Sequence, residues 1–148
     1  MTEPGFTHKC VMEVSGRVIL PASWIARVDI TAGVVVMPHL PSPLPEYMPA
    51  DVWPNTDEYE KHLEAVDSLY YSRSARTREL LRVVYGAISY EAVDNDGGVL
   101  VKGTARDIAR LEGEIVCVEL VDHLELWNAS RWEERMDMFD RSITDLLP

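Results

Sequence analysis

Two short segments of the sequence combine an acidic residue and a turn glycine at the same spacing, and the first continues with an arginine that could bind an anion. They read Glu13-Val14-Ser15-Gly16-Arg17 and Asp94-Asn95-Asp96-Gly97-Gly98. Glycine permits a turn with positive φ, and the acidic side chain can accept backbone or guanidinium hydrogen bonds that hold the loop. An arginine held in this way is a planar fork that can bind a phosphate or a guanine edge through two hydrogen bonds. The alternative for Arg17 is a surface charge that pairs locally with Glu13.

The remaining polar residues show no pattern that indicates catalysis or metal binding. The histidines are His8, His39, His62 and His123. They have no ligand spacing such as His-x-x-x-His, and the sequence contains no nucleophile motif or phosphate-binding loop. Carboxylates at 57–64 and 133–145 have the spacing of solvated helix faces. We therefore expect no enzyme activity, no cofactor, no metal and no small-molecule ligand.

The charge balance limits how the protein could bind nucleic acid. The 148 residues include 14 Lys and Arg against 25 Asp and Glu, for a formal net charge of −11. Binding to phosphate requires basic side chains, so this excess of acid argues against nucleic-acid binding over the whole surface. The acid is concentrated in 46–67 and 112–148, whereas residues 1–45 contain equal numbers of basic and acidic residues. Charges are screened over about 8 Å at physiological salt, so a small basic edge near Arg17 can act beside a distant acidic face.

Length and hydropathy indicate the class of protein. The chain fits one compact domain or two closely joined halves. It has no apolar run of the roughly 20 residues that a membrane helix needs, and its first residues lack the pattern of a secretion signal. We expect a cytoplasmic protein that does not bind membranes. Cys10 and Cys117 could form one disulfide, but both lie in strand-like segments, where buried reduced thiols are common.

The same order of residue types occurs twice along the chain. A shift of 81 residues aligns 13–20 with 94–101, Ser23 with Thr104, and 34–37 with 115–118, and a shift of 79 aligns 47–53 with 126–132. Such self-similarity predicts two copies of one structural unit. Because each copy has only short strands, neither can bury a core alone, and we expect the two halves to pair.

Each copy should contain short strands around the glycine turn and one short helix. We expect strands at 10–12, 18–20 and 33–37 in the first copy and at 87–93, 99–101 and 115–118 in the second. Ser23 and Thr104 are candidate caps of the short helices, the second of which should span 105–111 and end at Gly113. The prolines in 38–46 predict a stiff loop, since proline lacks the backbone N–H that a central strand uses.

Three longer amphipathic helices are expected. The first begins after Asn55 or Thr56, the second spans about 74–85 before Gly86, and the last begins at a capping box of Ser130 and Glu133. Their apolar stripes should pack between the two halves. These stripes are Tyr59, Leu63, Val66 and Tyr70 in the first, Leu80, Leu81, Val84 and Tyr85 in the second, and Trp132, Met136 and Phe139 in the last. The arginines between 73 and 82 read as a solvated helix face.

The sequence resembles the MraZ family, tandem-repeat members of the AbrB/SpoVT swapped-hairpin group. The likeness is carried by Glu13-Val-Ser-Gly-Arg-Val-Ile-Leu-Pro21, by the linker helix ending Leu80-Leu-Arg-Val-Val-Tyr-Gly86, and by Leu124-Glu-Leu-Trp-Asn-Ala-Ser-Arg-Trp132. The resemblance implies an α+β fold with a mainly β core, namely a double-ψ, swapped-hairpin AbrB-like β-barrel formed by two tandem repeats, with linker and C-terminal helices. The expected divisions are a first repeat at 1–72, a linker helix at 73–86 and a second repeat at 87–148.

The resemblance also implies a function and a set of residues. A member of this family is expected to be a nucleoid-associated transcriptional regulator that binds short direct repeats in the promoter of the division and cell-wall gene cluster as a ring-shaped homo-oligomer. The candidate DNA-binding residues are Lys9, Ser15 and Arg17, and the signature-loop residues are Glu13, Gly16, Asp94, Gly97 and Gly98. The chain departs from the family pattern at Gly98, which stands where arginine is usual, and at Ser15 and Asp96, which replace a basic residue. The alternative is an oligomeric scaffold of the same fold that has lost DNA binding.

Overall fold

The computed structural model describes residues 6–39, 48–70 and 75–146 as an α+β protein with antiparallel sheets. This confirms the expected α+β class. Along the chain the elements are β1 (Thr7–Met12), β2 (Arg17–Ile19), α1 (Ala22–Ile25), β3 (Val34–Pro38), β4 (Ala50–Pro54), α2 (Asp57–Tyr70), α3 (Ala75–Gly86), β5 (Ser89–Glu91), β6 (Gly98–Leu100), α4 (Gly103–Ala109), β7 (Gly113–Glu119), β8 (Leu124–Asn128) and α5 (Ala129–Leu146). No helix among these residues combines the length and apolar character needed to cross a membrane.

Strands from the two halves of the chain are interleaved in the sheets. The larger sheet has the order β1-β7-β8-β4-β3-β5, and β2 pairs with β6 in a second, two-stranded sheet. The first strand of each half pairs with the third strand of the other half, because β1 lies against β7 and β5 lies against β3. The strands β4 and β8 also pair across the halves. Each half therefore completes the hydrogen bonding of the other.

The larger sheet is buried on both faces where β3 crosses it. Successive side chains of a strand point to opposite faces. Val34 and Val36 accordingly join one apolar cluster with Val18 and Trp24, whereas Val35 and Met37 join a second cluster. Helices α2 and α3 cover this second face with buried side chains, namely Tyr59, Val66, Leu81 and Val84. This agrees with the packing predicted for these four side chains, and Leu63 packs against them. Tyr85 is 36% exposed, so the prediction is wrong for that side chain. The side chains of Tyr70 and Leu80 lie outside the described residues.

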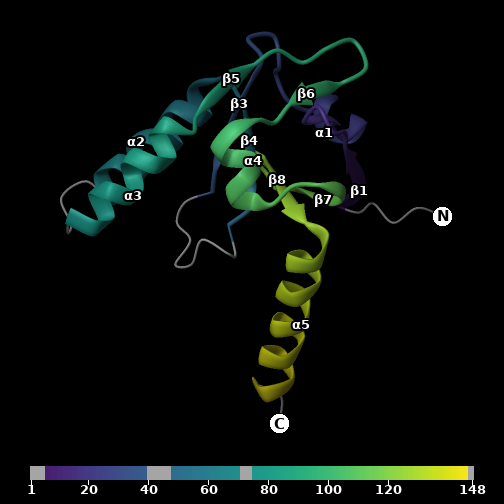
Figure 1. The fold of residues 1–148 in the computed structure, drawn as a ribbon, viewed down its shortest axis with the longest axis vertical. Coiled ribbons are helices and arrows are strands. Elements are labelled where there is room, and N and C mark those ends of the chain that lie inside the picture. Colours follow the sequence, from purple (N-terminus) through teal and green to yellow (C-terminus); the bar gives the residue numbers. More distant parts are fainter. Residues whose placement is uncertain (1–5, 40–47, 71–74, 147–148) are drawn as a thin grey trace.

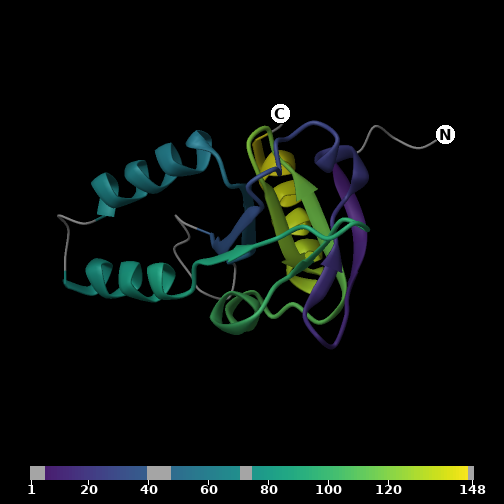
Figure 2. The ribbon, with the colours of Figure 1, turned by 90° about the horizontal axis from the view of Figure 1, so that it is seen from above.

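Two helical parts extend away from the sheets. Helices α2 and α3 run side by side on one side, and α5 extends in another direction (Figures 1 and 2). The stripe of α5 that was expected to pack between the halves is only partly covered within one chain. Met136 is 37% exposed and Phe139 is 56% exposed, so that prediction is wrong for these two side chains. The cause is geometric, since α5 leaves the sheet after its first turns.

The helix starts differ from the predicted caps. Helix α1 begins after Pro21, so Ser23 lies inside it and donates a hydrogen bond of 2.7 Å to Glu119 instead. Helix α4 begins after Lys102, which places Thr104 inside the helix as well. At the start of α5, Asn128 Oδ1 accepts the backbone N–H of Arg131 at 3.1 Å, so this asparagine performs the capping role predicted for Ser130.

One of the two predicted helix ends is observed where it was expected. Helix α3 ends at Gly86 as expected. Helix α4 ends before Arg110, a residue with φ of 52°, and Gly113 begins β7 rather than ending the helix. Pro38 is the last residue of β3, so the loop predicted for 38–46 begins too early. Proline is tolerated there because β5 pairs only with Val34–Val36 of this strand. The rest of the predicted loop, from residue 40 on, lies outside the described residues, as does Arg73.

The two cysteines lie on the adjacent strands β1 and β7. Both are free thiols, and Cys117 Sγ donates to Cys10 Sγ over 2.8 Å. Cys117 is buried, and its contact with Cys10 together with burial raises the pKa of its thiol. A thiol held in this environment is a weak nucleophile, because the thiolate is the reactive form.

Candidate functional site

The two signature loops have the same backbone structure. In the first, Gly16 N–H donates to the carbonyl of Glu13 at 2.9 Å and Glu13 N–H donates to the carbonyl of Arg17 at 2.9 Å. In the second, Gly97 and Asp94 make the corresponding bonds at 3.0 and 2.9 Å. Gly16 and Gly97 have φ of 95° and 83°, a left-handed conformation in which a side chain is unfavourable.

The fold places the two loops side by side. Strands β2 and β6 follow them and pair in register, with Arg17 opposite Leu100 and Ile19 opposite Gly98. The carbonyl of Gly16 accepts the N–H of Val101 at 2.8 Å, and the carbonyl of Gly97 accepts the N–H of Leu20 at 3.0 Å. We call the joint surface of residues 13–17 and 94–98 the loop edge.

The guanidinium of Arg17 links the two loops. Its Nη1 donates to Glu13 Oε2 at 2.9 Å, and its Nε donates to Asp94 Oδ2 at 2.9 Å. Nη2 reaches Asp94 Oδ1 at 3.3 Å and lies 3.5 Å from Asp96 Oδ2. Hydrogen bonds from Arg17 and from the backbone N–H of Gly98 and Asp96 lower the pKa of Asp94 to about 2. The local pairing considered for Arg17 is therefore present, and it extends to the second loop.

The unusual glycine at position 98 lies beneath this arginine. A Cβ at Gly98 would lie 2.5 Å from Arg17 Nε and 2.5 Å from Asp94 Oδ2, well inside van der Waals contact. A glycine at position 98 thus makes room for the arginine of the other loop. The consequence is that one guanidinium serves both loops.

One basic residue beside the loop edge was not predicted from the sequence. Arg106 of α4 donates from Nη1 to the carbonyl of Val14 at 3.1 Å, next to the exposed tip of the first loop. The 81-residue shift aligns Arg106 with Ile25, so the repeat gives no indication of its role. Against these two guanidinium groups stand three carboxylates, those of Glu13, Asp94 and Asp96.

Lys9 and Ser15, the other predicted DNA contacts, have different surroundings. Lys9 lies on β1 with its side chain 87% exposed, and its Nζ is 4.0 Å from Glu114 Oε1. The hydroxyl of Ser15 accepts the backbone N–H of Arg17 at 3.3 Å and so supports the turn. Ser15 belongs to the loop edge, whereas Lys9 offers a solvated charge on a neighbouring strand.

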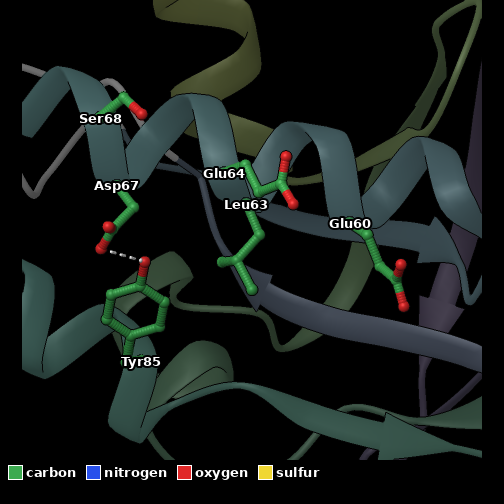
Figure 3. A pocket seen from close by; sticks show the side chains of 6 residues that line it. All are labelled: Glu60, Leu63, Glu64, Asp67, Ser68 and Tyr85. Carbon is green, nitrogen blue, oxygen red and sulfur yellow. Dashed lines mark hydrogen bonds between the residues drawn. The ribbon is translucent and has the colours of Figure 1, made fainter.

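An acidic hollow between α2 and α3 is unsuited to nucleic acid. It has a volume of about 520 Å³ and is lined by Glu60, Leu63, Glu64, Asp67, Ser68 and Tyr85 (Figure 3). Tyr85 donates to Asp67 Oδ1 at 3.0 Å, and burial together with this carboxylate raises the pKa of Tyr85 to about 12. Three carboxylates without a cation in the lining repel phosphate, so this hollow is not part of the loop edge.

The fold also joins two histidines that are far apart in the sequence. His39 and His123 lie within 4.8 Å, by their ligand atoms, of the carboxylates of Asp51 and Glu125. Burial opposes a charge on His123, but Glu125, Asp51 and Asp122 outweigh it and raise the pKa of His123 to about 9. The sequence shows no sign of this cluster, because its members are far apart along the chain. Asp51 lies on β4 and Glu125 on β8, whereas His39 follows β3 and His123 precedes β8.

Comparison with known proteins identifies the family. No family model matches the sequence. Over 119 residues the chain is 33% identical to the transcriptional regulator MraZ of Moorella thermoacetica, covering 80% of this chain and 76% of that protein. It is 31% identical over 145 residues to the transcriptional regulator MraZ of Limosilactobacillus reuteri, covering 95% and 94%, and 31% identical over 147 residues to that of Alkalilimnicola ehrlichii, covering 97% and 93%. The resemblance carried by the two loops and the closing tryptophan segment is thereby confirmed, and the chain belongs to the MraZ family of transcriptional regulators.

Proposed function

We propose that this protein is a DNA-binding transcriptional regulator whose loop edge contacts short direct repeats in the promoter of the division and cell-wall gene cluster. The observation that carries the proposal is the position of Arg17, which is fixed at an exposed edge by two identical turns in a chain whose relatives are named transcriptional regulators. The exchange of strands between the halves supports an AbrB-like swapped-hairpin barrel as the frame for this edge. A protein acting in this way is associated with the nucleoid.

Arg17 retains donors for an external acceptor. A guanidinium has five N–H groups. Three of them donate to Glu13 and Asp94, and the side chain is 27% exposed. The remaining N–H groups can donate to a phosphate or a guanine edge, which would compete with the carboxylates for the same cation. Contact through one such loop is expected to be weak and sensitive to salt.

Self-association of the chain raises the affinity for DNA above that of a single loop edge. Helix α5 extends from the sheets and leaves Met136 and Phe139 of its apolar stripe exposed, together with Met138 outside the stripe. Exposed apolar side chains of this kind favour contact with a second copy of the chain. A ring of such chains presents one loop edge per subunit to successive repeats. Each bound loop raises the effective concentration for the next, so weak individual contacts give a stable complex that occupies the promoter.

Binding of the full-length protein to a duplex from its own upstream region tests the proposal. Arg17→Gln should weaken binding and reduce the dependence of log K on log salt by about 0.9 for each phosphate that the variant no longer neutralises. Arg82→Gln is the matched control, because Arg82 carries the same charge on α3 and pairs with Glu79 at 2.5 Å. Equal affinity and an equal salt slope for wild type and Arg17→Gln would contradict the role of Arg17.

The scaffold function is the second candidate, and the charges at the loop edge favour it. Three carboxylates surround Arg17, and the second loop has Gly98 and Asp96 where the family has basic residues. A scaffold would form the oligomer and fail to bind the upstream duplex even at low salt. In the intermediate form the second loop is merely inactive, and an arginine restored by Gly98→Arg should tighten DNA binding. Because any side chain at Gly98 displaces Arg17, the reference is Gly98→Ala, and equal affinity of these two variants would count against that form.

A further inference from the structure

Four potential metal ligands meet at one end of the strands β3, β4 and β8. They are His39, which follows β3; Asp51 of β4; His123, which precedes β8; and Glu125 of β8. Asp51 and Glu125 are opposite each other in the pairing of β4 with β8, so their side chains share one face of the sheet. The arrangement thus depends on strand register and joins the two halves of the chain. We call these four residues the histidine–carboxylate cluster.

The cluster is largely enclosed by protein. The side chain of Asp51 is fully buried, and those of His123 and Glu125 are 10% and 13% exposed. The ring of His123 stacks on Trp53 with centroids 4.3 Å apart, and this indole separates the cluster from His62, which stacks on Trp53 at 4.3 Å. Buried carboxylates are unfavourable unless a cation or several hydrogen bonds compensate for the removal of water.

The outer atoms of two members are already occupied, which orients the inner atoms. Asp122 Oδ1 lies 2.7 Å from His123 Nδ1, and Trp127 Nε1 donates to Glu125 Oε1 at 2.9 Å. His123 Nε2 and Glu125 Oε2 therefore point into the cluster. His123 Nε2 is buried and has no hydrogen-bond partner among the described residues. A carboxylate on the far nitrogen of a histidine is the usual support of a metal-binding imidazole.

The distances between inner atoms fit one small cation. His123 Nε2 lies 3.7 Å from Asp51 Oδ1 and 3.8 Å from Glu125 Oε2. His39 Nδ1 lies 3.0 Å from Asp51 Oδ2 and 3.5 Å from Glu125 Oε2. Zinc bonds to nitrogen and oxygen of about 2.0–2.2 Å place tetrahedral ligands about 3.3–3.6 Å apart. The distances of 3.7 and 3.8 Å from His123 Nε2 are too long for hydrogen bonds. They are close to the separation of two ligand atoms that bind the same ion.

We propose that His39, Asp51, His123 and Glu125 bind one divalent transition-metal ion per chain, with zinc as the expected ion. Two imidazole nitrogens and two carboxylate oxygens are ligands that zinc accepts, and four protein ligands leave no open position for catalysis. The ion would be structural. It would connect β3 and β4 of the first half to β8 of the second, beneath Trp53, and its position is separate from the loop edge.

Zinc titration of the untagged full-length protein tests this inference without reference to DNA. After removal of metal with a chelator, competition against a chromophoric zinc indicator should give one tight site per chain, and the fluorescence of the tryptophans should change at the same stoichiometry. His123→Gln should weaken zinc binding by at least about 100-fold, and Asp122→Asn, which changes only the supporting contact, should weaken it by about 10- to 100-fold. His62→Gln is the matched control, since His62 stacks on the same indole and supplies no ligand; it should bind zinc as the wild type does.

Two results would overturn the site. The first is a wild-type protein that binds zinc no more tightly than His39→Gln/His123→Gln, which would leave the cluster as a set of ion pairs between protonated histidines and carboxylates. The second is one tight zinc per chain that survives His123→Gln and Glu125→Gln, which would place the ion elsewhere. Circular dichroism of each variant verifies folding, and the single variant His39→Gln changes the most exposed ligand, whose replacement perturbs the core least.

Discussion

The two turn glycines should respond differently to alanine although they are equivalent in the paired loops. Either substitution places a side chain at positive φ, which is unfavourable by about 1–2 kcal/mol. At Gly97 the new Cβ would lie 2.9 Å from Cδ1 of Ile25, a terminal methyl that can rotate away. At Gly16 it would lie 2.5 Å from the carbonyl oxygen of Val101. This is a backbone atom of a fully buried residue, so it cannot rotate away. We therefore expect Gly16→Ala to be the more harmful change.

The additional destabilisation at Gly16 comes from the backbone bond beside the clash. Moving Val101 away stretches its N–H bond to the carbonyl of Gly16, now 2.8 Å, and a hydrogen bond of this kind contributes about 0.5–1.5 kcal/mol. The free energy of unfolding should fall by about 2–3 kcal/mol for Gly16→Ala, against about 1–2 kcal/mol for Gly97→Ala. The two variants are expected to differ in free energy of unfolding because of the clash with the Val101 carbonyl, since positive φ is common to both sites.

Urea unfolding at one fixed protein concentration measures this difference. With a slope of about 2 kcal/mol/M, a gap of about 1 kcal/mol separates the two midpoints by about 0.5 M. Protein concentration must be held constant, because self-association adds to apparent stability. Equal midpoints for the two variants, or a lower midpoint for Gly97→Ala, would refute the assignment of the clash to Val101.

Three further outcomes follow from the loop edge and from α5. Gly98→Ala should displace the guanidinium of Arg17 from Asp94, so the pKa of Asp94 measured by NMR should rise from about 2, and an unchanged value would contradict the overlap. In the wild type the Arg17–Asp94 contact lowers a folded-state pKa, so its contribution to stability is complete above about pH 4 and is lost as the pH falls toward 2. The stability difference between wild type and Arg17→Gln should shrink over that window, and a constant difference would argue against the contact. Phe139→Asp should leave the chain folded, because the side chain is 56% exposed, but should lower the oligomer mass by light scattering; an unchanged mass would exclude this part of α5 from the interface.

The parts of the fold that were predictable are those fixed by neighbouring residues. The strand β7 and helix α3 follow from β-branched runs, from 3.6-residue periodicity and from a terminal glycine. The residues that cap the helices were harder to predict, because several polar side chains near the start of a helix can each take this role. Asn128 caps α5 in place of Ser130, and Ser23 is drawn away from capping by Glu119, a partner 96 residues distant.

Sequence by itself determined the family, the fold class and the existence of two matched glycine turns, because these depend on residue types at short range and on similarity along the whole chain. Tertiary structure alone decided what the polar residues of those turns contact. Arg17 meets Asp94 across 77 residues, and two scattered histidines meet Asp51 and Glu125, because strands of the two halves pair in one register. Register is set by which faces are buried over the whole sheet, so a contact that depends on it cannot be read from local spacing.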